Sequence, residues 1–256
     1  MQFQILGCGS SMGVPRSDGD FGKCNPNEKK NYRTRCSAII KTKNVNILID
    51  TSPDLRTQLL NNKIKSIDKV FYSHMHADQT HGINDLRVFF IKNKKTIPVY
   101  TDTPTSKYLM KSFSYCFKKT FNEYPPILRL KKIKKRFYIQ DNKKKILIQS
   151  IIVKHGRVSS VCYIINKRLA YISDVSEIYK KDFHYFSNLE YLIIDCLWYR
   201  NHGSHFNYEQ SLKMIKLFNP KKAILTNLHS DLDYNDLKKK LPKNITPAYD
   251  GLTINF

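Results

Sequence analysis

Residues 73–82 read Ser-His-Met-His-Ala-Asp-Gln-Thr-His-Gly and carry three histidines and one aspartate. His74 and His76 are two residues apart, so an extended backbone would place both on one face. Asp78 and His81 follow at the point where the pattern becomes helical. Imidazole and carboxylate groups at this density are suited to zinc or another first-row metal. The segment therefore predicts a metal site directly after a strand.

Several other apolar segments also end in a histidine or an aspartate. The residues at these strand ends are Asp50, His155, Asp174 and His229. A strand that carries such a side chain to its end is a common way to position a site residue. The recurrence of this arrangement is far more specific than any one of these residues alone, and it predicts one site assembled from distant parts of the chain.

Apolar patterning predicts the elements that would position these residues. Strands are expected at residues 3–6, 37–41, 45–50, 68–73, 98–101, 146–153, 161–165, 169–172, 191–194 and 223–226. Helices are expected at residues 55–61, 82–93, 105–119 and 208–218. The mixture of strands and helices indicates an α/β or α+β chain. Residues 18–35 show no periodicity and are expected to form a loop.

The tract at residues 120–145 differs from the rest because it is strongly basic between residues 129 and 136. We expect a projecting loop and a pair of strands. Such an element could be a substrate-binding arm. It could equally be an edge whose lysines discourage strand-to-strand aggregation.

The composition and net charge of the chain indicate which kinds of substrate and partner to expect. The chain has 256 residues, which we expect to form one domain over residues 1–256, and 44 Lys and Arg against 21 Asp and Glu give a formal charge of +23. This charge favours a small anionic substrate. The lysines are scattered along the chain without an arginine-aromatic pattern, so nucleic acid is a less favoured partner. A homodimer is left open.

The sequence lacks the patterns of disulfide-rich, secreted and membrane-spanning proteins, and this predicts the cellular compartment. The six cysteines are widely spaced and form no Cys-x-x-Cys pair, so a disulfide framework is not expected. The N-terminus has no basic segment followed by a long apolar one, and no apolar run is long enough to cross a bilayer. We expect a cytoplasmic protein without membrane contact.

Taken together, these residues resemble the metallo-β-lactamase superfamily, whose pattern is an early Asp, then His-x-His-x-Asp-His, a distant His, a bridging Asp and a last His. The resemblance covers nearly the whole chain. The segments 7–16 (Gly-Cys-Gly-Ser-Ser-Met-Gly-Val-Pro-Arg), 81–87 (His-Gly-Ile-Asn-Asp-Leu-Arg), 226–229 (Thr-Asn-Leu-His) and 249–251 (Tyr-Asp-Gly) look like a narrower branch. That branch contains the phosphoribosyl cyclic phosphate phosphodiesterase of phosphonate breakdown.

The resemblance implies a four-layer αββα sandwich with metal ions at one edge between the sheets. It implies a first metal site of His74, His76 and His155, a second site with Asp78 and His229, and Asp174 as a bridge between them. Asp50 would orient a ligand histidine. A metal-bound hydroxide would attack the phosphodiester. His205 would donate the proton to the leaving group, with His202 as the reserve.

One departure from the superfamily pattern is Gln79, which stands where a histidine usually follows the aspartate. As a candidate metal ligand, Gln79 would offer a neutral carboxamide oxygen, which is a poorer partner for zinc than imidazole. We therefore expect two divalent ions, zinc or manganese, with a single ion as the alternative. His81 is either a substitute ligand or a structural histidine. The early loop offers only Cys24, so we expect no structural zinc, and we expect all six cysteines to be packing residues.

The leading functional hypothesis is a metal-dependent phosphodiesterase that acts on a small or cyclic phosphodiester. One alternative is an RNA-processing nuclease of the tRNA 3′-end type that uses residues 129–136 as an RNA arm. A second alternative is a metal-binding module that has lost catalysis through the change at Gln79.

Overall fold

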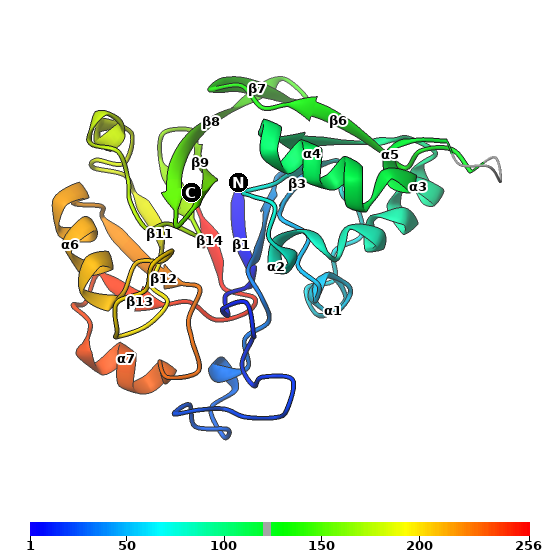
Figure 1. Ribbon diagram of the computed structural model, residues 1–256. Coiled ribbons are helices and arrows are strands. Elements are labelled where there is room, and N and C mark those ends of the chain that lie inside the picture. Colours follow the sequence, from blue (N-terminus) through cyan, green and yellow to red (C-terminus); the bar gives the residue numbers. More distant parts are fainter. Residues whose placement is uncertain (120–123) are drawn as a thin grey trace.

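A computed structural model describes residues 1–119 and 124–256. Two seven-stranded sheets lie face to face, and helices cover the outer face of each sheet (Figure 1). These four layers confirm the αββα sandwich expected from the resemblance. Of the described helices, none is long and apolar enough to span a membrane.

The first sheet is built mainly from the N-terminal half and has the order β14-β1-β2-β3-β4-β5-β6. Its strands are β1 (Gln2–Gly7), β2 (Ser37–Lys41), β3 (Asn46–Ile49), β4 (Lys69–Phe71), β5 (Ile97–Thr101), β6 (Leu128–Lys132) and β14 (Thr253–Asn255). Strands β3 to β6 are parallel, whereas β14, β1, β2 and β3 pair antiparallel. The helices of this half are η1 (Lys29–Asn31), α1 (Leu55–Asn61), α2 (Ala77–Thr80), η2 (Ile83–Leu86), α3 (Arg87–Asn93), α4 (Thr103–Ser112) and α5 (Ser114–Phe117).

The second sheet has the order β13-β12-β11-β10-β9-β8-β7. Its strands are β7 (Arg136–Asp141), β8 (Lys144–His155), β9 (Val158–Ile165), β10 (Leu169–Ile172), β11 (Tyr191–Asp195), β12 (Lys222–Thr226) and β13 (Ile245–Pro247). Strands β10 to β13 are parallel, so their carboxyl ends lie at one edge of the sheet. The helices of this half are η3 (Lys180–Tyr185), α6 (Tyr208–Phe218) and α7 (Tyr234–Lys240).

The strands bury side chains on both faces because each sheet lies between two other layers. In β2, Ala38 and Ile40 belong to the core between the sheets, whereas Ile39 packs in the core beneath the helices of the first half. This alternation follows the two-residue period of a strand. Between the sheets, the ring of Phe71 on β4 stacks on Phe137 of β7 with ring centroids 5.2 Å apart. The two halves therefore share one apolar core.

Most of the predicted elements are confirmed, and α6 has the predicted bounds. The hairpin of β2 and β3 is also confirmed. The predicted helix at 82–93 is a 3-10 turn followed by α3. The predicted helix at 105–119 begins earlier, because Asp102 caps it by accepting from the backbone N–H of Thr105, and it breaks at Phe113 (φ −131°).

The prediction for residues 120–145 needs a correction. Residues 120–123 lie outside the described part of the chain. The two strands that follow do not form a pair of their own, because β6 is the edge of the first sheet and β7 is the edge of the second. They cross from one sheet to the other (Figure 1). Their lysines and arginines thus lie on edge strands, where charge hinders aggregation.

Candidate functional site

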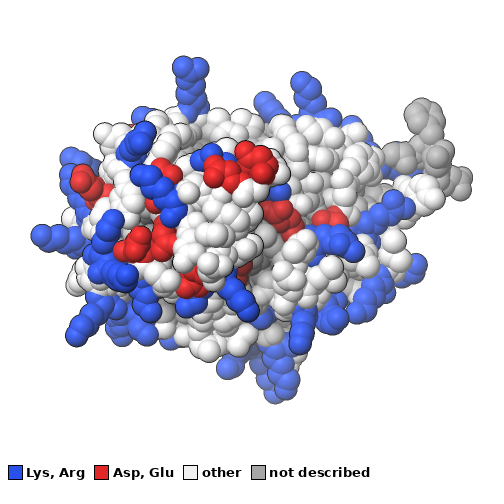
Figure 2. All heavy atoms as spheres, turned by 90° about the horizontal axis from the view of Figure 1, so that it is seen from below, with Lys and Arg blue, Asp and Glu red and all other residues white. Residues whose placement is uncertain are grey.

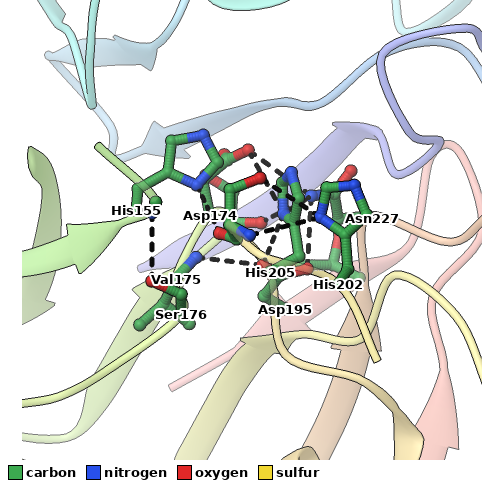
Figure 3. Close-up of polar contacts among 12 residues, drawn as sticks. His155, Asp174, Val175, Ser176, Asp195, His202, His205 and Asn227 are labelled. Carbon is green, nitrogen blue, oxygen red and sulfur yellow. Dashed lines mark hydrogen bonds and ion pairs between the residues drawn. The ribbon is translucent and has the colours of Figure 1, made fainter. Parts of the chain in front are cut away.

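The predicted site residues come from loops that follow strands of both sheets. The strand-end residues that meet there are His74 after β4, His155 at the end of β8, Asp174 after β10, Asp195 at the end of β11 and Asn227 after β12. Because β10, β11 and β12 are parallel, three of these residues share one edge of the second sheet. Figure 3 shows how the side chains from the second sheet converge.

Three imidazoles form the centre of the site. Nδ1 of His76 lies 2.9 Å from Nε2 of His74 and 3.2 Å from Nε2 of His155. The ring centroids of the three residues are 4.6 to 5.0 Å apart. Nitrogen atoms at such distances could all bind one ion, so this is a candidate metal site.

The protonation of these rings fits metal binding. Nδ1 of His155 lies 2.6 Å from the carbonyl oxygen of Ser204, which can only accept a hydrogen bond. That nitrogen therefore carries the proton, and Nε2 presents a lone pair to the centre. Burial lowers the pKa of His74 to about 3 and also lowers the pKa values of His76 and His155. All three rings are neutral at pH 7, which is the form that binds a metal.

Asp50 supports this cluster through the backbone. Its Oδ1 accepts a hydrogen bond of 2.7 Å from the backbone N–H of Ser73, and Oγ of Ser73 lies 3.0 Å from Nδ1 of His74. Asp50 thus acts on His74 through the preceding residue and not on the ring itself. Its backbone is left-handed (φ +62°), and its second oxygen is buried without a partner among the described atoms.

Asp78 and Gln79 lie on the short helix α2, beside the imidazoles. Burial, with a contribution from the charge of Asp174, raises the pKa of Asp78 to about 6. Nε2 of Gln79 donates to Oδ2 of Asp78 at 3.2 Å and to Oδ2 of Asp174 at 3.4 Å. Although burial alone would raise the pKa of Asp174, the positive charge that His74 and His155 carry when protonated lowers it overall. Gln79 therefore contacts both carboxylates of the site.

His205 lies close to Asp174 (Figure 3). Its Nδ1 is 2.8 Å from Oδ2 of Asp195 and 4.0 Å from Oδ1 of Asp174. Burial alone would lower the pKa of His205, but the carboxylate of Asp195 raises it to about 9. Burial raises the pKa of Asp195 itself to about 6. At pH 7 the pair therefore holds His205 protonated and able to donate. His155, Asp174 and His205 form a second group with metal-ligand spacing.

Asn227, which directly follows β12, is the residue that reaches this group. Its Nδ2 donates to the carbonyl oxygen of Ser173 at 3.0 Å, to Oδ1 of Asp195 at 3.2 Å and to Oδ1 of Asp174 at 3.4 Å. The backbone of Asn227 is left-handed (φ +61°), which turns the chain sharply at the strand end.

His229, which the resemblance places in a second metal site, belongs to neither group of candidate ligands within the described chain. Its ring stacks on Trp198 with centroids 4.5 Å apart, and its Nε2 lies 3.4 Å from the guanidinium of Arg16. Arg16 and the loop at residues 11–18 line a cavity of about 680 Å³. The structure therefore places His229 against Arg16, which lines this cavity.

The two remaining histidines of the sequence analysis lie at the rim. His81 is exposed, and its Nε2 lies 2.9 Å from the hydroxyl of Tyr108. His202 is exposed, and its Nδ1 accepts from the backbone N–H of Ser204 at 3.3 Å. Neither belongs to a group of candidate metal ligands in the described residues.

Two residues of the site were given no role from the sequence, Asp195 and Asn227. Both were visible at strand ends, because Asp195 closes β11 and Asn227 follows β12 directly. Position relative to the strand was therefore the useful signal. Residue type instead favours His229, two residues after Asn227.

Comparison with known proteins agrees with this geometry. The model of the beta-lactamase superfamily domain matches residues 45–227, which is most of the chain. The chain belongs to this superfamily. The matched residues include the three clustered histidines, Asp174 and Asn227, and the match ends before His229.

Solved structures extend the comparison to the whole chain. The crystal structure of a diphosphatase from the PhnP family is 27% identical, with a TM-score of 0.89 over 100% of this chain and 97% of that one. Zinc-bound PqqB from Methylobacterium extorquens is 15% identical, with a TM-score of 0.78 and full coverage of both chains. The short form of human tRNase Z is 16% identical, with a TM-score of 0.68 over 100% and 99%. The PqqB and tRNase Z structures share the fold of this chain.

A curated relative from Porphyromonas gingivalis (strain ATCC BAA-308 / W83) is named octanoyltransferase. It is 31% identical over 259 residues, which is 98% of this chain. The chain spans about half of that protein (51%).

Proposed function

We propose that this superfamily member is a metal-dependent phosphodiesterase that acts on a small anionic substrate. The observation that carries the proposal is the convergence of three neutral imidazoles beside Asp174 and a protonated His205. The likeness to a PhnP-family diphosphatase over nearly the full length of both chains supports it.

In this proposal His74, His76 and His155 would hold the metal ion, and Asp174 lies beside His155. Such an ion supplies a Lewis acid for phosphoryl oxygens and lowers the pKa of water. His205 donates a proton to the leaving oxygen, and Asp195 keeps the imidazole protonated and fixed in orientation. Asp78 lies in the first turn of α2, two residues after His76.

The charge distribution supports an anionic substrate. Figure 2 views the end of the molecule that carries the N-terminal loop, which lies at the bottom of Figure 1. Lys and Arg surround the rim of this face, and most of the visible Asp and Glu lie toward its middle. A basic rim attracts anions toward the face.

Two other activities have less support. The RNA-processing alternative expected an arm at residues 129–136, but β6 and β7 are sheet edges. Acyl transfer, which the name of the Porphyromonas relative indicates, can use an activated thiolate as its nucleophile. All six cysteines of this chain are buried, and burial raises the pKa of every one of them. Such thiols are poor nucleophiles.

The proposal is tested with bis-p-nitrophenyl phosphate, a cyclic phosphodiester and a diphosphate, each with added manganese or zinc. We expect hydrolysis of at least one substrate and loss of activity in His76→Ala. The matched control is His184→Ala, because His184 is exposed and lies outside the site. No turnover with either metal would overturn the proposal. Retention of one metal ion without turnover would favour the non-catalytic binding module.

A further inference from the structure

The carboxylate of Asp174 lies between two carboxamides. Nε2 of Gln79 is 3.4 Å from Oδ2, and Nδ2 of Asn227 is 3.4 Å from Oδ1. All three side chains are buried, with exposed fractions of 0% for Gln79 and 2% for Asp174 and Asn227. Each carboxylate oxygen therefore faces a different neutral N–H donor.

The neighbours of each carboxamide fix its orientation. The NH₂ group of Asn227 also faces the carbonyl oxygen of Ser173 at 3.0 Å, which can only accept. The NH₂ group of Gln79 also faces Oδ2 of Asp78 at 3.2 Å. A flip of either side chain would turn an amide oxygen toward these acceptors, which is unfavourable. Both amides therefore donate to Asp174.

The superfamily pattern expects Asp174 to bridge two metal ions, but its two oxygens face these two donors. A carboxylate that bridges two ions gives one oxygen to each, and here both oxygens already accept hydrogen bonds. A buried carboxylate needs such partners if no cation balances it. Carboxamides satisfy that need, and they are weaker zinc ligands than imidazole.

We propose that this chain binds a single metal ion, at His74, His76 and His155, and that Gln79 and Asn227 replace the second ion as partners of Asp174. The inference rests on the metal site of the proposed function. It assigns the last ligand position of the pattern to Asn227, because position 227 and not 229 reaches Asp174.

The other group of candidate ligands does not restore a second site. It needs His205, but Nδ1 of His205 is held at 2.8 Å by Asp195 and lies 3.1 Å from Nδ2 of Asn227. His155 is shared with the first site, and its Nδ1 contacts the carbonyl oxygen of Ser204. One ion can use His155 Nε2, whereas a second ion would have to displace these contacts.

The test is metal content. The full chain is saturated with Mn(II) or Zn(II), passed through a desalting column and analysed by elemental mass spectrometry. We expect one ion per chain, and the Mn(II) form should give the electron paramagnetic resonance spectrum of an isolated ion. Two tightly held ions, with an exchange-coupled manganese spectrum, would overturn the inference and leave the proposed hydrolase intact. Zero ions would instead overturn the metal site itself.

The paired variant Gln79→His/Asn227→His should gain a second ion and an exchange-coupled spectrum. Its matched control is Asn93→His/Gln140→His, which adds two histidines at exposed positions and should still bind one ion. If the paired variant does not fold, the number of metal ions bound by the wild-type chain still tests the single-ion proposal. A paired variant that folds and stays at one ion would contradict the role assigned to the two carboxamides.

Discussion

Nδ1 of His205 lies 2.8 Å from the carboxylate of Asp195, and this contact leaves Nε2 as the nitrogen available to a substrate. Asp195 is fully buried at the end of β11, so the pair is fixed to the sheet. The arrangement resembles the general acid of other enzymes, in which a carboxylate sets both the tautomer and the charge of a histidine.

The first prediction concerns leaving groups. His205→Gln should lower kcat by about 10²- to 10⁴-fold for a substrate with an alkoxide leaving group, because that oxygen needs a proton as it departs. The same variant should change kcat little for p-nitrophenyl esters, whose leaving group departs without one. Steady-state kinetics on both substrates, with metal content measured in parallel, checks this. Equal losses on both substrates would show that His205 supports the site and does not act as the acid.

The second prediction concerns acid stability. The carboxylate of Asp54 accepts three hydrogen bonds from Arg35. The donors are the backbone N–H (2.9 Å), Nε (2.8 Å) and a terminal guanidinium nitrogen (2.6 Å) of Arg35. Burial alone would raise the pKa of Asp54, but these hydrogen bonds lower it below the ordinary value. The unfolded chain therefore takes up the proton at higher pH than the folded chain. The contribution to stability is complete above the ordinary pKa of about 3.9 and is lost as pH falls through the folded value.

Asp54→Asn should thus lower the free energy of unfolding by about 1 kcal/mol at pH 7, since the pair is partly exposed. The difference from wild type should shrink as the pH falls below about 4. Urea unfolding of both proteins at pH 7 and pH 3 measures it. A difference that stays constant over this range would mean that the carboxylate charge is not the cause.

The sequence predicted much of the site because its ligands follow strands. Spacing and strand ends identified His74, His76, His155 and Asp174, and the fold brings them together. The sequence does not predict the role of Asn227, because its approach to Asp174 depends on a left-handed backbone after β12. Residue type does not reveal that conformation. Likewise, the strands at residues 128–141 were expected, but which sheet each one joins depends on contacts remote in sequence.

The third prediction concerns the close packing of Gly82, which follows α2, against the start of α1. A Cβ at Gly82 would overlap the carbonyl oxygen of Ser52 and lie 2.9 Å from Cβ of Leu55. Gly82→Ala should therefore lower the free energy of unfolding by about 3 kcal/mol, the upper end of overpacking costs. Gly203→Ala is the matched control, because nothing lies within 4 Å of its Cβ position. Thermal or urea unfolding compares the two, and similar stabilities for both variants would contradict the prediction.

The fourth prediction concerns the start of α6, two residues beyond His205. Asn207 forms a capping box: its side chain accepts from the backbone N–H of Gln210 at 2.8 Å, and its backbone N–H donates to Oε1 of Gln210 at 2.9 Å. Asn207→Ala should lower the free energy of unfolding by about 1 kcal/mol. Asn207→Asp should keep most of that stability, because a carboxylate also accepts at a helix N-terminus.

Asn207 also donates to Oδ1 of Asn201 at 2.7 Å, a contact that neither variant keeps. The comparison of the two variants by urea unfolding therefore separates the cap from this second contact. If Asn207→Asp loses as much stability as Asn207→Ala, the contact with Asn201 and not the cap holds this end of the helix. If only the alanine variant is weakened, the cap fixes the start of α6 and with it the segment that carries His205.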